Sequence, residues 1–71
     1  MHVHVLTRED RNQHGYIDTS IIGVYRELKL ARLERLRDRR RAIAEGLDVN
    51  YSNPHGDTWE VYWKIEGAVL E

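Results

Sequence analysis

The chain of 71 residues has no cysteine, no phenylalanine and a single proline. Without cysteine there can be no disulfide, no thiolate ligand for a metal and no cysteine nucleophile. One proline and five glycines are too few to indicate disorder. A chain this short forms one domain, residues 1–71, and hides only about 60% of the surface of its unfolded state. Its stability therefore depends on good packing, a metal or a partner, which includes a second copy of the chain.

Long apolar runs and an excess of charge are also missing. No apolar stretch approaches the ~18 residues that a membrane span needs, and residues 1–5 lack the basic-then-apolar pattern of a signal peptide. We therefore expect a cytoplasmic protein without membrane contact, which the absence of cysteine also fits. The formal net charge is −1, so bulk charge does not indicate nucleic-acid binding.

Two strands are expected in the first third of the chain. Residues 2–6 alternate with period two, which places Val3 and Val5 on one face and His2 and His4 on the other. Residues 7–19 are polar and are expected to form a loop. Residues 20–25 are rich in β-branched side chains and favour a second strand. The alternative is a helix that starts at residue 18, with a glycine in its interior.

A helix is predicted from Glu27 to Glu45, with Gly46 as its C-terminal stop. At ~100° per residue its apolar side chains form one stripe, expected to pack on the sheet. This leucine stripe comprises Leu33, Leu36, Ile43, Ala44 and Leu47, with Leu30 at its edge. Lys29 and Arg40 also lie in it, either with apolar stems on the sheet and charges in water, or with Arg40 paired to a carboxylate of the fold or a partner.

The last third of the chain holds a turn at residues 53–56 and the clearest strand, residues 58–65. Val49 and Tyr51 are expected to add a short strand, and Gly67 is expected to end the pattern. The predicted fold class is α+β, a small β-β-α-β(-β) domain with a mainly antiparallel sheet covered on one face by a single long helix. Alternation places Trp59, Val61, Trp63 and Ile65 toward the helix, with Val3, Val5 and Ile22 or Ile21. The open face is expected to carry His2, His4, Tyr25, Tyr62 and Lys64.

The segment Ile21-Ile22-Gly23-Val24-Tyr25, between a first strand and a helix, with Trp59-Glu60-Val61-Tyr62-Trp63 in a closing strand, resembles a group of small phage and bacterial proteins. These proteins share an "IGVY" second strand and have no established activity. The chain departs from them in its arginine-dense helix and in lacking a Ser or Asp cap after Tyr25. The resemblance implies a phage or prophage product.

Catalysis and metal binding have little support in the sequence. Neither serine lies in a nucleophile motif, the glycines are scattered rather than gathered in a phosphate-binding loop, and a chain this small rarely encloses a pocket. We therefore expect no enzyme and no cofactor. His2 and His4 share a strand face and could bind one ion, with His14, His55 or Asp57 completing the shell. No third ligand stands at a diagnostic spacing.

Charge is segregated along the chain although the total is balanced. Residues 27–46 hold seven basic and four acidic residues, and the rest holds four basic and eight acidic. Arg32, Arg35 and Arg39 follow one line of the helix, where they suit phosphate. An acidic line, Glu27, Glu34, Asp38 and Glu45, runs beside them. Its carboxylates can pair with arginines, as Asp38 can with Arg41, so a self-paired solvated surface is the alternative.

Protein binding accounts best for the small core, the uncovered sheet face and the abundance of Trp, Tyr and Arg, which anchor many interfaces. The sequence predicts a non-enzymatic module that binds and modulates a host or phage protein, and a homodimer is possible. The predicted contact residues are Tyr25, Tyr62, Lys64, Arg32, Arg35 and Arg39. The alternative is a nucleic-acid-binding protein that uses the same arginines, and the second alternative is metal binding through His2 and His4.

Overall fold

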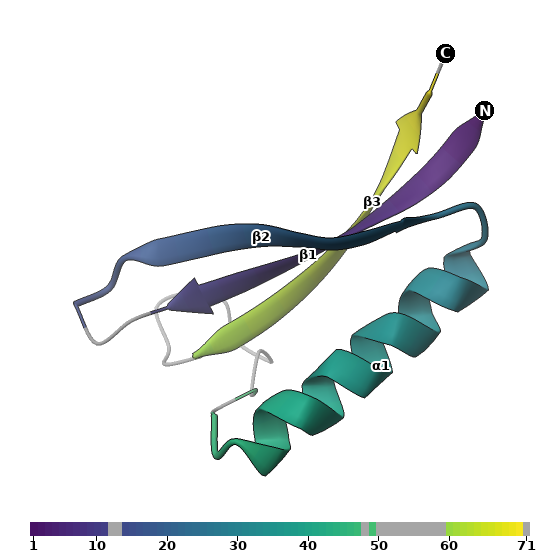
Figure 1. Cartoon of the computed structure of the whole chain (residues 1–71). Coiled ribbons are helices and arrows are strands. Elements are labelled where there is room, and N and C mark those ends of the chain that lie inside the picture. Colours follow the sequence, from purple (N-terminus) through teal and green to yellow (C-terminus); the bar gives the residue numbers. More distant parts are fainter. Residues whose placement is uncertain (12–13, 48, 50–59, 71) are drawn as a thin grey trace.

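The computed structural model describes residues 1–11, 14–47, 49 and 60–70 of the chain. In chain order it contains β1 (His2–Arg11), β2 (Ile17–Tyr25), α1 (Leu28–Ala44) and β3 (Val61–Val69). The strands form one antiparallel sheet in the order β2-β1-β3, and α1 lies along one face of it (Figure 1). The predicted α+β class and the β-β-α-β order are confirmed.

The strands extend further than the sequence pattern indicated. β1 runs to Arg11 and β2 begins at Ile17, so most of the expected loop at residues 7–19 is a long hairpin. Backbone pairing carries the polar residues into the sheet, and Gly15 at φ 84 makes the turn. β3 continues through Gly67 to Val69, because backbone pairing with β1 continues past the glycine.

Residues 20–25 belong to β2. The strand interpretation of residues 20–25 is confirmed, and the alternative helix from residue 18 is wrong. A register shift between Leu6 and Thr7 bulges the β1–β2 ladder. The possible short strand at Val49 and Tyr51 includes Tyr51, which lies outside the described residues, as does Trp59.

α1 begins and ends within one residue of its predicted bounds. Glu27 precedes it without a side-chain cap hydrogen bond. At its other end Gly46 adopts φ 83, and the N–H of Leu47 donates to the carbonyl oxygen of Ala42 at 3.1 Å. A left-handed glycine with this backbone hydrogen bond is a common helix terminator, as the sequence predicted.

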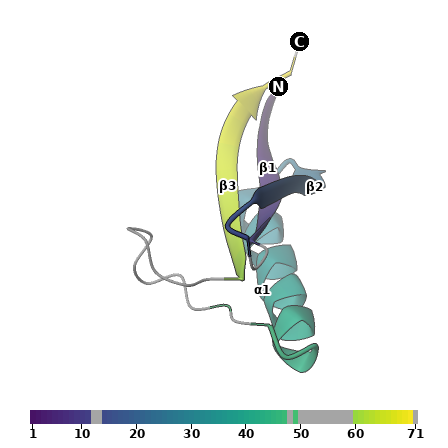
Figure 2. The same ribbon diagram turned by 90° about the vertical axis from the view of Figure 1, so that its left-hand side faces the viewer.

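The register of β1 and β3 decides which side chains face α1. Leu6 lies opposite Ile65, and Arg8 lies opposite Trp63. Directly opposed residues share a face, and successive residues alternate between faces. Leu6 and Trp63 belong to the core cluster, so the even-numbered residues of β1 are on the helix side. Figure 2 shows β1 between β3 and β2.

Three side-chain placements expected from strand alternation are corrected by this register. Val3 and Val5 are on the sheet face opposite the helix, although Val3 is buried there, and His2 and His4 are on the helix side. Tyr25, opposite His4, packs against the core rather than on the open face. Its ring lies over Gly23, where a Cβ atom would collide with it. The sequence showed the alternation of each strand but not how the two alternations align.

The inner face of α1, defined as Ala31, Asp38 and Ala42, is the part of the helix buried against the sheet. The core cluster on this side consists of Leu6, Ala42, Val49, Val61 and Trp63, with Tyr25, Leu47 and Ile65 packed around it. The expectation that the leucine stripe covers the sheet is therefore wrong. Leu47 lies beyond the helix and packs beside the core, and Leu36 is exposed on the side of the helix near Trp63. The remaining side chains of the stripe are exposed on the side away from the inner face.

The two ends of the described chain lie side by side, which closes the β1–β3 pair. The N-terminal ammonium of Met1 donates to the carbonyl oxygen of Leu70 at 2.8 Å, and the N–H of Leu70 donates to the carbonyl oxygen of Met1 at 2.8 Å. Both ends project beyond the N-terminal end of α1 (Figure 1).

Candidate functional site

Asp38 is the one charged residue of the described chain that is buried, with 4% of its surface exposed. Its Oδ2 accepts a hydrogen bond from Nε1 of Trp63 at 2.7 Å and another from Nη1 of Arg8 at 3.1 Å. Its Oδ1 accepts from Nη1 of Arg41 at 3.2 Å. A buried carboxylate is tolerated when it is paired and hydrogen-bonded in this way.

This network explains why α1 presents its inner face to the sheet. The opposite orientation would bury the indole N–H of Trp63 without an acceptor and leave Arg8 with Asp10 as its only carboxylate. It would also bring Lys29 and Arg40 onto apolar surface. Ala42 belongs to the core cluster that contains Trp63, and its small side chain lets the helix backbone approach the sheet there. Shape and hydrogen bonding therefore outweigh the apolar area of the leucines.

Arg8 is held on the sheet by two carboxylates. Its Nε donates to Oδ1 of Asp10 at 2.9 Å, in addition to the contact with Asp38. Burial lowers the pKa of the guanidinium, but hydrogen bonds and charges from Asp10 and Asp38 outweigh burial, so the pKa of Arg8 is raised. Arg8 is therefore a permanent positive charge with a structural role.

The outer face of α1 carries most of the leucine stripe and is exposed. We define it as Lys29, Leu30, Leu33, Leu36, Arg40 and Ile43. Its four apolar side chains are 43%, 42%, 41% and 52% exposed, in chain order. They recur at helical spacing along one side of the helix, with Lys29 at one end of the line and Arg40 between Leu36 and Ile43. Arg40 is exposed and forms no ion pair within the described part of the chain.

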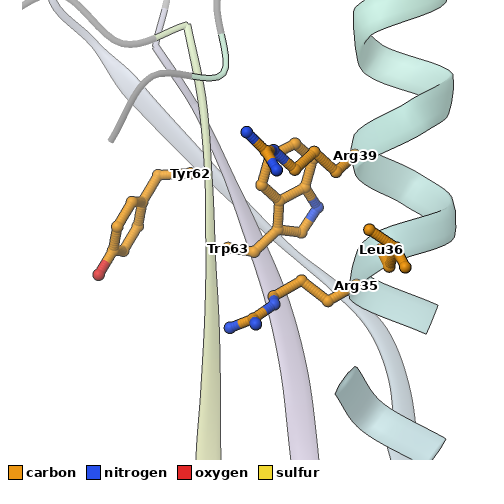
Figure 3. Close-up of a pocket in the computed structure, with 5 residues that line it drawn as sticks. All are labelled: Arg35, Leu36, Arg39, Tyr62 and Trp63. Carbon is orange, nitrogen blue, oxygen red and sulfur yellow. The ribbon is translucent and has the colours of Figure 1, made fainter. Parts of the chain in front are cut away.

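A hollow of about 150 Å³ lies between α1 and β3. It is lined by Arg35, Leu36, Arg39, Tyr62 and Trp63. Figure 3 shows Arg35 and Arg39 extending from the helix toward β3, with the Trp63 ring between α1 and β3. Neither arginine has a carboxylate partner among residues 1–11, 14–47, 49 and 60–70. Two guanidinium groups beside an indole therefore face one recess.

The predicted contact residues are divided among different surfaces. Arg35 and Arg39 reach into the hollow, which Tyr62 also borders, and Arg32 is exposed on the neighbouring side of the helix. Tyr62 points from β3 to the side away from α1 (Figure 3), and Lys64 follows it at the same alternation. Lys64 Nζ lies 2.8 Å from Oε1 of Glu66; this hydrogen bond and the negative charge raise its pKa.

Tyr25 is separated from the other predicted contact residues. Burial raises the pKa of its phenol, and the charge of Glu34 adds to this effect. The residues that sequence reasoning missed are Asp38, which it placed in a surface acidic line, and the outward-facing leucines. The sequence feature that could have indicated the inner face is the pair of alanines at positions 31 and 42, which lie on the same side of the helix as Asp38.

The acidic line of α1 pairs with only part of the basic residues. Glu34 Oε1 lies 2.7 Å from Nη1 of Arg37, and Asp38 pairs with Arg41 as predicted. Helix residues 28–44 hold seven basic and two acidic residues, a net charge of +5. The arginines at positions 32, 35, 39 and 40 lack such pairs in the described chain, so self-pairing does not neutralise the helix.

Within the described residues, no cluster of three or more His, Asp or Glu side chains could hold a metal ion. His2 is exposed, His4 is half-buried, and they lie opposite Val69 and Gly67 of β3, which offer no side-chain ligand. No helix of the described chain has the length and apolar character to cross a membrane.

Comparisons with known proteins give no assignment. No protein-family model, no curated protein and no solved structure matches the chain. Function is therefore argued from the two surfaces described above, the outer face of α1 and the hollow beside β3.

Proposed function

We propose that the chain is a non-enzymatic module that binds a partner protein through the outer face of α1. The observation that carries this proposal is the line of four large apolar side chains on the side of the helix opposite the core. Contiguous exposed apolar surface on a small protein marks an interaction site. Anchors at such helical spacing are the usual means by which one helix docks into an apolar groove or along another helix.

The charges around the apolar line select the kind of partner. Lys29 and Arg40 lie within the line, Arg32 and Arg39 flank it, and α1 as a whole carries +5. Complementary charge speeds encounter and excludes wrong partners. The proposed occupant is therefore an acidic amphipathic helix of another protein, whose leucines cover the apolar line while its carboxylates meet the four cations.

A second copy of the chain fits this surface less well. Antiparallel packing of two outer faces about a two-fold axis between Leu36 and Arg37 would place Arg40 opposite Leu33 and Lys29 opposite Ala44. No carboxylate would then meet either cation, and charges of one sign would be brought together. The homodimer is one of the outcomes of the test below.

The test uses a labelled acidic helical peptide with leucines at positions i, i+3, i+4 and i+7 and glutamates beside them. We expect micromolar binding that weakens roughly tenfold in Leu30→Gln/Leu33→Gln. Docking can remove from water only the exposed 43% of Leu30 and 42% of Leu33, which is worth just under about 1 kcal/mol for each leucine. The matched control is Ile21→Thr/Val24→Thr, which removes exposed apolar side chains from β2. Equal binding of a peptide with glutamine in place of glutamate would contradict the charge argument, and no binding to the parent would overturn the proposed occupant.

Sedimentation equilibrium of the same proteins tests the second copy as occupant. We expect the parent to be a monomer at micromolar concentration. A dimer in the parent that Leu30→Gln/Leu33→Gln abolishes would replace the acidic helix by a second copy. A dimer that survives this change would lie elsewhere on the molecule.

Nucleic-acid binding is the second candidate, and one observation favours it. Arg32, Arg35 and Arg39 lie along one side of α1 without a carboxylate partner in the parts of the chain described. Fluorescence anisotropy with labelled single- and double-stranded DNA and RNA tests it at low and physiological salt. Binding that falls steeply with salt and disappears on replacing the three arginines by glutamine would promote this candidate. Absence of binding at low salt would remove it.

Two finer parts of the proposal rest on the sequence alone. The IGVY resemblance supports a phage or prophage origin and a host or phage protein as the partner. The lack of cysteine supports a cytoplasmic setting.

A further inference from the structure

The outer edge of β3 carries backbone groups with which no strand of the described residues pairs. The N–H of Arg11 donates to the carbonyl oxygen of Glu60 at 2.8 Å, and Leu70 and Met1 exchange hydrogen bonds at the other end. Residues of an antiparallel strand alternate between directing both backbone groups to one neighbour and to the other. Even-numbered residues of β3 therefore pair with β1, and Val61, Trp63 and Ile65 direct theirs outward. In the described chain no strand lies on that side.

An added strand would place its side chains beside the hollow. A residue paired directly opposite Trp63 shares the face of the Trp63 side chain, which is the helix side. Arg35 and Arg39 extend to this place from α1 (Figure 3). Both lack a carboxylate partner in the described residues, whereas Arg8, which is close by on the same side of the sheet, has two.

We propose that the edge of β3 accepts an extended acidic segment of another protein as a fourth, antiparallel strand. Its central residue, opposite Trp63, is Asp or Glu, and its carboxylate binds between the guanidinium groups of Arg35 and Arg39. Residues two positions before and after it lie opposite Val61 and Ile65 and are apolar. Backbone hydrogen bonds supply general affinity, and the charge-assisted contact supplies specificity.

Binding at the edge of β3 does not require binding at the outer face of α1. The two surfaces use different kinds of contact and share two side chains, Leu36 and Arg39, which border both. They can be occupied by one partner or by two. Loss of binding at one surface therefore leaves the other to be tested separately.

A second copy of β3 does not match the charge at this edge. The helix side of β3 consists of Val61, Trp63, Ile65, Gly67 and Val69. None of these residues is acidic, so pairing of β3 with a copy of itself would leave both arginines without a carboxylate. Charge complementarity favours a different, acidic chain.

The test uses a seven-residue peptide, Thr-Val-Thr-Glu-Thr-Val-Thr with blocked ends, titrated into the ¹⁵N-labelled full chain. We expect saturable shifts of the Val61, Trp63 and Ile65 amides and of the Arg35 and Arg39 Nε–H groups. The glutamine version of the peptide should bind roughly tenfold more weakly, because a hydrogen bond between charged groups is lost. A peptide N-methylated at the central residue should not bind, because it cannot donate to β3.

Protein variants separate the proposed contact from general attraction between opposite charges. Arg35→Gln/Arg39→Gln should weaken binding of the glutamate peptide roughly tenfold and abolish its preference over the glutamine peptide. The matched control, Arg26→Gln/Arg37→Gln, removes two exposed charges outside the hollow. It should keep both the affinity for the glutamate peptide and the preference over the glutamine peptide. Equal binding of the two peptides to the parent, shifts away from β3, or no binding at millimolar peptide would each overturn the proposal. Leu30→Gln/Leu33→Gln should bind the peptide normally, whatever happens at the outer face.

Discussion

The inner and outer faces of α1 reverse the usual division of a helix on a sheet. The inner face buries two alanines and an aspartate, while the outer face exposes three leucines and an isoleucine to solvent. Hydrophobicity alone would turn the helix round. The observed orientation is the one that satisfies the polar groups of Trp63 and Arg8 and fits small side chains against a large ring. The unused apolar line is then available for binding.

Of the changes on the two faces, Asp38→Ala on the inner face is expected to lower the stability of the fold most. The change leaves the indole N–H of Trp63 and the guanidinium of Arg8 in the interior without the acceptor that joins them. Removing one partner of a buried charged network costs about 3–5 kcal/mol, a large part of the stability of a domain this small. We expect urea unfolding followed by circular dichroism to show a mostly unfolded protein, or a midpoint shifted far down.

Two further variants serve as comparisons for Asp38→Ala, one intermediate and one control. Asp38→Asn keeps an acceptor for Trp63 and should fall between the parent and Asp38→Ala. Glu34→Gln removes a carboxylate whose partner, Arg37, is exposed, and it should change stability by less than about 1 kcal/mol. If Asp38→Ala unfolded at the same urea concentration as the parent, the inner face would not depend on this network.

Smaller changes in stability are expected from one substitution on each face of α1. Ala42→Leu adds apolar area to the helix but has no space for it against Leu6 and Trp63, so we expect a loss of about 1–3 kcal/mol. Leu33→Ala removes apolar area from the outer face and should cost less than about 1 kcal/mol in the isolated chain. The measurement is the urea midpoint of each variant at low protein concentration. A stable Ala42→Leu together with a strongly destabilised Leu33→Ala would reverse the assignment of the two faces.

The sequence predicted the elements of the fold better than their alignment. Alternation in residues 2–6 and 58–65, the β-branched residues at 20–25 and the strong helix formers before Gly46 were enough for the β-β-α-β order. Periodicity could not show which helix side meets the sheet, because that depends on Trp63 and Arg8, on other strands. Nor could it show that Leu6 pairs with Ile65, and this pairing moved Tyr25 and the two histidines to the helix side.

The candidate site was predictable in part for the same reason. The line of Arg32, Arg35 and Arg39 is visible in the sequence at helical spacing, and Tyr62 follows from alternation in β3. That Arg35, Arg39 and Tyr62 border one hollow depends on how closely α1 approaches β3, which the small inner-face residues permit. The outward leucines were recognised as a stripe, but they were assigned to the core because apolar stripes usually cover a core.

The smallest expected effect concerns the titration of Tyr25, which packs against the core near Glu34. Burial and the charge of Glu34 raise the folded-state pKa of its phenol above the ordinary value of 10.0. Below pH 10 the phenol is protonated in both states, so its contribution to stability is constant. As pH rises through 10 the unfolded chain loses this proton first, and stability falls until the folded-state pKa is passed.

We expect phenolate absorbance to show one tyrosine ionising late in the folded protein, and this late component should be absent in Tyr25→Phe and in urea. Glu34→Gln should bring it part of the way back toward 10. A late component that persists in Tyr25→Phe would show that the shift belongs to another tyrosine, and that Tyr25 is less enclosed by the helix side than its packing indicates.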